Sequence, residues 1–218
     1  MIEYLSKSLK NQLLQGLPGE EFQHRMAPHR LSSFKYGQKP KDPKKSSVLI
    51  LLYPFNKSVH VCLIQRPQYE GHHSGQVAFP GGKQEEEDTT LYDTALREAK
   101  EEIGINANGI EPIGELSSLF IPVSNFLVQP FIGILRETPS FSINKKEVEE
   151  VIPVPLSTLL DKTIVCSGKI QLGNGSFLET SYYLINNKKI WGATAMMISE
   201  FTELLKRIEK INELIICD

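Results

Sequence analysis

The segment from Gly81 to Ile105, GGKQEEEDTTLYDTALREAKEEIGI, places two glycines, an acidic loop and an amphipathic helix in direct succession. Six apolar residues recur at helical spacing and would form the face packed on a core: Leu91, Tyr92, Ala95, Leu96, Ala99 and Ile103. Asp88 or Thr89 can cap the start of this helix, and Gly104 stands where a left-handed C-terminal cap belongs. The segment therefore predicts a turn followed by a helix with a defined beginning, end and buried face.

The other side of this helix would carry three carboxylates. Glu98 and Glu102 are four residues apart, and Glu98 and Glu101 are three apart, so a helix brings them to one side. Like charges at these spacings repel, and a cation among them removes the repulsion. Carboxylate oxygens suit hard divalent ions, which predicts a Mg²⁺ or Mn²⁺ site held by Glu98, Glu101 and Glu102. Alternatively the run is only a solvated helix face, but the glycine turn and the caps favour the metal site.

The run from Arg97 to Gly104, REAKEEIG, resembles the Nudix box, in outline a glycine, an acidic residue and then Arg-Glu-x-x-Glu-Glu-x-Gly. Asp88 fills the acidic position, and Gly82 lies one residue further from the arginine than in the common pattern. The resemblance implies a mixed α/β (α+β) fold, a Nudix-type α/β/α sandwich with a mixed sheet between helices. It also implies a metal-dependent pyrophosphohydrolase.

The longer glycine spacing resembles the Nudix branch that hydrolyses coenzyme A, in which a second motif precedes the box. This chain has LIQRP at residues 63–67 and HSGQVAFPGG at residues 73–82. It departs from that motif at Pro67, at Glu85 and at Glu70-Gly71, where the branch has a serine, an aspartate and Leu-Arg. Weaker similarity continues through residues 147–156 and 191–195. The resemblance implies substrate contacts from six residues: Arg66, His73, Gln76, Gly81, Gly82 and Lys83.

Cleavage of a phosphoanhydride needs a positioned water, neutralised phosphoryl charge and a stabilised leaving phosphate. We expect Glu98, Glu101 and Glu102 to hold the ion that supplies these. Arg97 would orient the carboxylates, since it can pair with Glu101 one turn further along the helix. The catalytic base is either Glu98 or Glu147, because Nudix enzymes take it from the helix or from a later loop. The charged run around Glu147 also fits an ordinary surface turn.

Composition excludes several classes of protein. The 218 residues carry 24 basic and 26 acidic side chains, and the net charge of -2 predicts no binding to nucleic acid or to anionic membranes. No stretch resembles a membrane span or a secretory signal. Cys62, Cys166 and Cys217 lie far apart, which argues against a zinc ribbon or disulfide framework and favours a cytoplasmic protein. The expected partner is a small nucleotide-like substrate, and the chain could be a monomer or a homodimer.

The pattern along the chain predicts two parts. Residues 1–45 would form a helix and a proline-containing connector packing on the core, with Ile2, Leu5, Leu9 and Leu13 on one helix face. Residues 46–218 would form the Nudix hydrolase domain. We expect strands at 48–53, 59–64, 114–119 and 126–135, a hairpin over 171–185, and a last helix that begins near Ser199.

Three functions are compatible with the sequence. The first, implied by the resemblance, is metal-dependent hydrolysis of the pyrophosphate bond of coenzyme A or its acyl derivatives to 3′,5′-ADP and 4′-phosphopantetheine. The second is hydrolysis of another nucleoside diphosphate derivative, such as ADP-ribose, NADH or a damaged nucleotide. The third is a noncatalytic Nudix module that only binds a nucleotide. Such modules often lose the box glutamates, whereas this chain keeps all three.

Overall fold

The computed structural model describes residues 2–27, 42–69, 71, 73–173 and 175–215. Its strands are β1 (Lys44–Phe55), β2 (Ser58–Gln65), β3 (Val77–Ala78), β4 (Gly81–Lys83), β5 (Glu111–Glu115), β6 (Leu119–Ile121), β7 (Phe126–Ile134), β8 (Glu150–Pro155), β9 (Val165–Gln171), β10 (Phe177–Ile185) and β11 (Lys188–Ile190). Its α-helices are α1 (Ile2–Leu14), α2 (Glu20–His24), α4 (Leu91–Ile103), α5 (Leu156–Leu160), α6 (Gly192–Lys206) and α7 (Ile211–Leu214). No described helix is long and apolar enough to cross a membrane.

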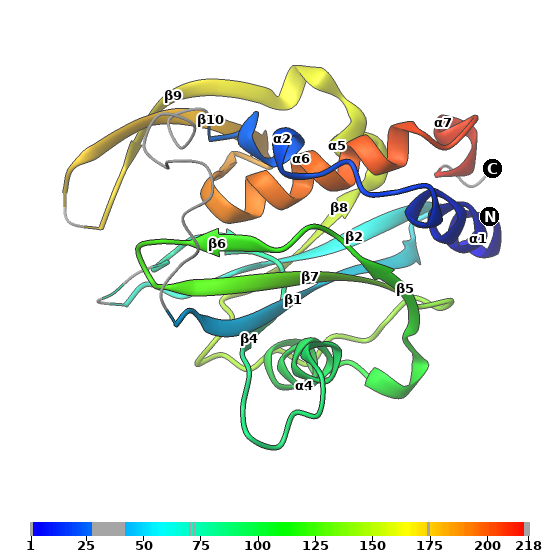
Figure 1. The fold of residues 1–218 in the computed structure, drawn as a ribbon, viewed down its shortest axis with the longest axis horizontal. Helices are drawn as coiled ribbons and strands as arrows, with labels where there is room; N and C mark the ends of the chain where they lie inside the picture. The colour runs from blue at the N-terminus through cyan, green and yellow to red at the C-terminus, as the bar shows by residue number, and fades with distance from the viewer. Residues whose placement is uncertain (1, 28–41, 70, 72, 174, 216–218) are drawn as a thin grey trace.

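Most of the described strands form one mixed sheet that lies between helices (Figure 1). The order across the sheet is β3-β2-β1-β7-β5, with β4 paired to β1, β6 to β7 and β8 to β2. β1 and β7 run parallel, and the other pairs of this sheet are antiparallel. α4 covers one face, and α6 with α2 covers the other. The predicted α/β/α sandwich is therefore confirmed.

The central hairpin confirms two predicted strands and lengthens both. β1 and β2 pair through a turn at Asn56 and Lys57, whose φ angles of 45° and 60° are the left-handed values that a two-residue hairpin turn needs. β1 starts at Lys44, before the predicted residue 48, because Lys44 pairs with Phe126 of β7. The predicted connector therefore ends earlier than expected, and its residues 28–41 lie outside the described part of the chain.

Later strands follow the predictions with shifted boundaries. The predicted strand at 114–119 is two short strands, β5 and β6, while β7 matches the prediction for 126–135. The predicted hairpin over 171–185 is present as β9 and β10, in which Gln171 pairs with Phe177. Its first strand begins at Val165, and Asn174 in its turn lies outside the described residues. With β11, this hairpin forms a separate antiparallel sheet.

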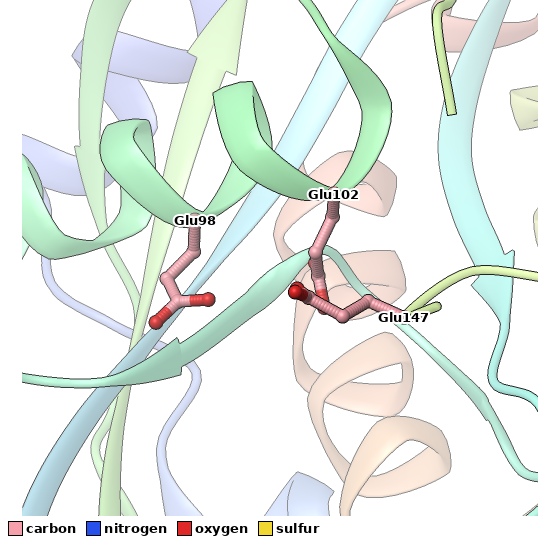
Figure 2. Close-up of side chains that lie close together, drawn as sticks. All are labelled: Glu98, Glu102 and Glu147. Carbon is pink, nitrogen blue, oxygen red and sulfur yellow. The ribbon is translucent and has the colours of Figure 1, made fainter. Parts of the chain in front are cut away.

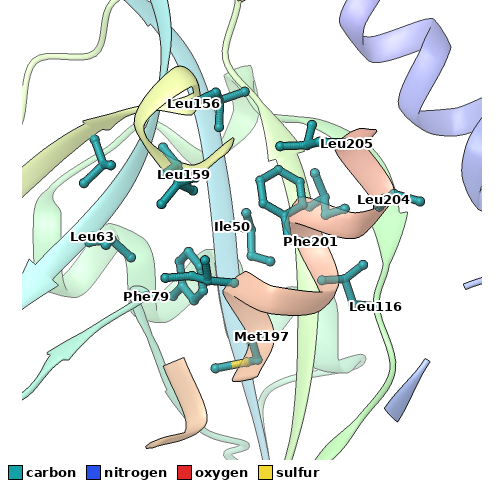
Figure 3. Close-up of a cluster of buried hydrophobic side chains, with 14 of the residues drawn as sticks. Ile50, Leu63, Phe79, Leu116, Leu156, Leu159, Met197, Phe201, Leu204 and Leu205 are labelled. Carbon is teal, nitrogen blue, oxygen red and sulfur yellow. The ribbon is translucent and has the colours of Figure 1, made fainter. Parts of the chain in front are cut away.

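The main sheet separates two hydrophobic cores, because successive residues of a strand point to opposite faces. Leu49, Leu51 and Tyr53 of β1 belong to the cluster under α4, whereas Ile50 and Leu52 belong to the larger cluster under α6. Figure 3 shows part of the larger cluster, with side chains from α6 beside those of the sheet. β1 therefore connects the two cores through the centre of the molecule.

The carboxylate-bearing helix α4 has the predicted end but a different start. Thr90, rather than Asp88 or Thr89, is the N-cap: its Oγ1 accepts a hydrogen bond from the Asp93 N–H at 3.1 Å. Asp93 Oδ2 accepts one in return from the Thr90 N–H at 2.8 Å, which completes a capping box. Gly104 ends the helix in the predicted left-handed conformation, with φ of 67°.

The last long helix begins earlier than predicted. α6 starts at Gly192 rather than near Ser199, and a residue with positive φ, Lys210, separates it from α7. The sequence pattern did not reveal the first half of α6, because every residue from Thr194 to Thr202 is buried. A helix buried on all sides has no polar face, and so it lacks the periodicity by which amphipathic helices are recognised.

The N-terminal helix is part of the core and not only an outer layer. Leu5 and Leu9 of α1 are fully buried and belong to the larger cluster. Lys10 binds Glu111 of β5 at 2.8 Å, which fastens the same helix to the sheet. The apolar face of α1 therefore packs on the larger cluster, a partner that amphipathic spacing alone does not identify.

A buried carboxylate on α6 joins three distant segments. Glu200 is fully buried, and its Oε1 accepts hydrogen bonds from the Gly19 N–H at 3.2 Å and the Ser117 Oγ at 2.7 Å. Its Oε2 accepts one from Gln23 Nε2 at 2.7 Å. A buried charge is tolerated only when hydrogen bonds replace its lost hydration. Glu200 thereby ties α2 and the end of β5 to the helix over the larger core.

We predict that Glu200→Gln lowers the free energy of unfolding by about 3 kcal/mol, because the new amide would face donors that need an acceptor. Glu203→Gln on the same helix is the matched control. Glu203 forms only partly exposed ion pairs, with Arg25 at 3.6 Å and Lys206 at 3.7 Å, so its loss should cost less than about 1 kcal/mol. Urea unfolding of both variants measures this, and equal effects would contradict the role given to Glu200.

Candidate active site

Three carboxylates from two segments converge at the edge of α4. Glu98 and Glu102 project from the same side of the helix, one turn apart, and Glu147 reaches them from the loop before β8 (Figure 2). One carboxylate oxygen from each of the three lies within 4.8 Å of the others. Oxygen atoms at such separations can share one hard divalent cation. The structure therefore brings two of the three predicted ligands together and adds a third from elsewhere in the chain.

Glu102 is the most deeply buried member of this cluster. Its side chain is 2% exposed, and its Oε2 accepts a hydrogen bond from the Gly81 N–H at 2.9 Å. The guanidinium of Arg66 lies 3.7 Å from its Oε1. The pKa of Glu102 is raised to about 8, with burial as the largest cause. The Gly81 N–H and Arg66 oppose this rise, and the charges of Glu98 and Glu147 add to it. Ionisation of Glu102 at neutral pH therefore costs free energy unless a cation compensates the charge.

Glu98 packs directly on the glycine turn. A Cβ atom at Gly82 would overlap the Glu98 carboxyl group, and one at Gly81 would overlap the carbonyl oxygen of Ser47. Gly81 also has φ of 152°, a conformation that other residues rarely adopt. Burial is the main cause that raises the pKa of Glu98. Both predicted glycines are thus required by the close approach of turn, strand and helix.

Arg97 holds the acidic loop against the helix. Its Nε and Nη2 donate to the two oxygens of Asp88 at 2.9 and 3.0 Å, and Nη2 also donates to the Lys83 carbonyl at 3.0 Å. Its Nη1 donates to Glu98 at 3.0 Å. The Arg97 guanidinium is the main cause that lowers the pKa of Asp88 to about 2. Arg97 is thus placed to orient carboxylates, and Asp88 is its partner rather than a helix cap.

Glu101 lies beside the cluster and not in it. Its side chain is 51% exposed, and its Oε2 accepts a hydrogen bond from Arg97 Nη1 at 3.1 Å. The same nitrogen also binds Glu98, so Glu101 borders the site through Arg97. Helical spacing alone predicts that Glu101 joins Glu98 and Glu102 as a ligand, whereas the structure groups those two with Glu147.

The loop that carries Glu147 is docked on the C-terminal end of α4. The Ser142 N–H donates to the Ile103 carbonyl and the Asn144 N–H to the Glu102 carbonyl, both at 2.9 Å. These contacts satisfy carbonyls that a helix end leaves without partners. Val148 is fully buried in the cluster under α4 and anchors the far side of the loop. The sequence signal for this placement is weak, since it consists of one apolar residue in a charged run.

A cavity of about 370 Å³ opens beside the three carboxylates. Its lining includes Glu98, Glu102 and Glu147, together with all six residues predicted to contact substrate: Arg66, His73, Gln76, Gly81, Gly82 and Lys83. The lining also includes an apolar wall from β6, β7 and α6, formed by Ile121, Phe126, Val128, Ala193 and Met197. Arg97 and Glu101 are not among the lining residues. The cavity is therefore lined by both charged and apolar side chains.

The loop between β2 and β3 contributes a strained residue to this cavity. His73 has φ of 67°, a left-handed value that is costly for a residue other than glycine. Its Nδ1 lies 3.1 Å from Gln76 Oε1, and its Nε2 lies 3.4 Å from the Oγ of Ser124, another lining residue that the sequence did not suggest. Gln65 Nε2 donates to the Gly75 carbonyl and holds the base of the loop. These contacts define the position of the imidazole at the cavity wall.

The donor set suits a hard divalent cation bound near phosphate. Three carboxylates supply only oxygen ligands, and neither described cysteine, Cys62 or Cys166, is among them. Arg66 Nε is buried and has no hydrogen-bond partner among the described residues, which leaves one donor of the cavity wall unused. An oxyanion in the cavity could satisfy it.

Comparisons with known proteins agree with this geometry. A family model described as the NUDIX domain matches residues 43–164. Nudix hydrolase 3 of Caenorhabditis elegans is 32% identical over 174 residues, which cover 73% of this chain and 72% of that protein. An uncharacterized Nudix hydrolase of Yersinia enterocolitica, NudL, is 34% identical over 142 residues, which cover 65% of this chain and 71% of that protein.

A solved structure of a MutT/nudix family protein from Enterococcus faecalis has a TM-score of 0.49 and 18% identity, and covers 86% of this chain and 74% of that chain. The match to the family model and the identity to the curated relatives establish the family. The chain belongs to the Nudix hydrolases and is a pyrophosphohydrolase.

Proposed function

We propose that this protein hydrolyses the pyrophosphate bond of coenzyme A or its acyl derivatives and releases 3′,5′-ADP and 4′-phosphopantetheine. The observation that carries this proposal is the position of the motif that precedes the glycine turn. Arg66, His73 and Gln76 belong to that motif, lie before the box in the sequence and line the same cavity as the carboxylates. The apolar wall of the cavity offers a surface for a pantetheine arm or an adenine face.

Nudix hydrolases typically use a divalent metal, and the proposed ion is Mg²⁺ or Mn²⁺ held by Glu98, Glu102 and Glu147. When bound, such an ion neutralises phosphoryl charge and lowers the pKa of a coordinated water. The chain itself supplies the remaining parts of the site. Arg66 and Lys83 are the cations placed to contact phosphate oxygens, and the Gly81-Gly82 turn lets backbone approach them closely. Glu101, which the sequence also suggested, would act through its contact with Arg97.

The base that activates water is either Glu98 or Glu147 in this proposal. Both border the cavity, and each keeps a carboxylate oxygen within reach of the ion position. Glu102 suits this role less well, because its side chain is only 2% exposed whereas that of Glu98 is 15% exposed. The chosen residue must reach a water beside the pyrophosphate.

Gly71 is the feature that favours a different nucleoside diphosphate as substrate. The coenzyme A branch has an arginine at this position, and a glycine removes one cation that could bind phosphate. ADP-ribose, NADH and damaged nucleotides share the diphosphate but lack the 3′-phosphate of coenzyme A. The same carboxylates would serve their hydrolysis.

We predict that the protein cleaves coenzyme A faster than ADP-ribose, NADH and nucleoside triphosphates at equal concentration, with either Mg²⁺ or Mn²⁺ present. Mass spectrometry of the products should detect 4′-phosphopantetheine and 3′,5′-ADP. A preference for another dinucleotide would replace the proposed substrate while keeping the reaction type. Binding of a nucleotide without turnover would instead identify the protein as a binding module.

We predict that removing the charge of a proposed metal ligand lowers kcat more than removing the charge of a neighbouring glutamate that does not bind the ion. Glu102→Gln and Glu147→Gln should each lower kcat by at least about tenfold, because each removes a ligand charge. Glu101→Gln is the matched control from the same helix turn, and it should change kcat by less than about fivefold since this side chain is half exposed and bound to Arg97. A larger loss of kcat in Glu101→Gln than in Glu147→Gln would instead favour Glu98, Glu101 and Glu102 as the metal ligands.

The pH dependence of stability gives a further prediction. The pKa of Glu102 is raised in the folded protein to about 8, so folding is favoured by its bound proton. This stability is fully present below the ordinary carboxyl pKa and is lost as pH rises through about 8. In EDTA, the melting temperature of the protein should therefore fall between pH 6 and pH 9, and Glu102→Gln should remove part of that fall. Parallel pH profiles for the two proteins would show that Glu102 is not the titrating group.

A further inference from the structure

We propose that Asn144 is a positioning residue that holds the carboxylate of Glu147 toward the two helix glutamates. The inference rests on the proposed function, because it concerns the third carboxylate of the proposed ion site. Asn144 lies outside the Nudix box and three residues before Glu147. Its backbone contacts Glu102 of α4, and its side chain contacts Glu147 of the following loop.

Asn144 makes hydrogen bonds through its backbone N–H and through both polar atoms of its side chain. Its backbone N–H donates to the Glu102 carbonyl at 2.9 Å, and its Nδ2 donates to Glu147 Oε1 at 3.1 Å. Its Oδ1 accepts a hydrogen bond from the Lys146 N–H at 3.2 Å, which makes a local turn. Asn144 therefore bridges the helix and the third carboxylate while it shapes the short segment between them.

Asn144 Nδ2 is the only hydrogen-bond donor to the Glu147 carboxylate among the described residues. Glu147 is partly exposed, and it forms no ion pair within 4.0 Å among the described residues. Repulsion from Glu98 and Glu102 would drive it toward solvent in the absence of an ion. A hydrogen bond from a neutral amide restrains the rotamer without cancelling the charge that a cation needs.

The fold of the loop does not depend on this side-chain bond. The Ser142 N–H binds the Ile103 carbonyl, the Glu149 N–H binds the Gln65 carbonyl at 2.9 Å, and Val148 is fully buried. These anchors hold the loop from both sides through backbone contacts and apolar burial. Loss of Nδ2 should thus release the Glu147 carboxylate while the loop stays in place.

The test is Asn144→Ser, which keeps a neutral oxygen for the Lys146 N–H but is too short to donate to Glu147. We expect Mn²⁺ binding, measured by calorimetry and by electron paramagnetic resonance, to weaken by about tenfold with an unchanged melting temperature. The matched control is Asn106→Ser. Asn106 Oδ1 accepts a hydrogen bond from the Asn108 N–H at 3.2 Å in a similar turn that has no carboxylate partner, so Mn²⁺ binding should not change.

A double-mutant cycle separates positioning from a general structural effect. In a Glu147→Gln background, Asn144→Ser should produce no further loss of Mn²⁺ affinity, because the group on which Asn144 acts is already neutral. Mn²⁺ binding by Asn144→Ser equal to that of the unaltered protein would overturn the proposal, and so would an equal loss in both backgrounds. If the unaltered protein binds no Mn²⁺, the proposed ion site fails and this inference fails with it.

Discussion

Close packing between the Gly81-Gly82 turn and α4 is the contact on which the site depends. The Gly81 N–H donates to Glu102, and the absence of a side chain at Gly82 leaves room for Glu98. This contact orders both helix glutamates against the sheet and removes them from solvent. Since burial raises the pKa of both carboxyl groups, the packing that builds the site also makes its unbalanced charge costly. A divalent cation is the natural compensation for that cost.

Two arginines, Arg97 and Arg66, lie beside the carboxylate cluster and differ in how fully their nitrogens are hydrogen-bonded. Arg97 binds Asp88, Glu98, Glu101 and a backbone carbonyl, so it orders the acidic loop and forms no ion pair with Glu102 or Glu147. Arg66 Nη1 lies 3.7 Å from Glu102, and Arg66 Nε has no hydrogen-bond partner within the described part of the chain. The arrangement keeps negative charge for a metal and positive charge for phosphate in one cavity.

Much of the fold and of the site could be predicted wherever local pattern carries the information. The helix α4, its glycine cap and the central hairpin follow from spacing, capping and turn chemistry. All six residues expected to contact substrate line one cavity. The start of α6 could not be predicted, because a helix buried on every side has no polar face to mark it. The burial of Leu5 and Leu9 depended on what α1 packs against, which spacing does not reveal.

The sequence by itself determined that Glu98 and Glu102 share one side of a helix and that two glycines precede it in a turn, because helix geometry and backbone freedom are local properties. Only the tertiary structure decided which other carboxylate joins them. Glu101 is rotated by about 100° from Glu102 around the helix axis and points toward solvent and Arg97. Glu147 is brought in by a loop docked on the end of α4, through long-range backbone hydrogen bonds and the burial of Val148 that no local pattern encodes.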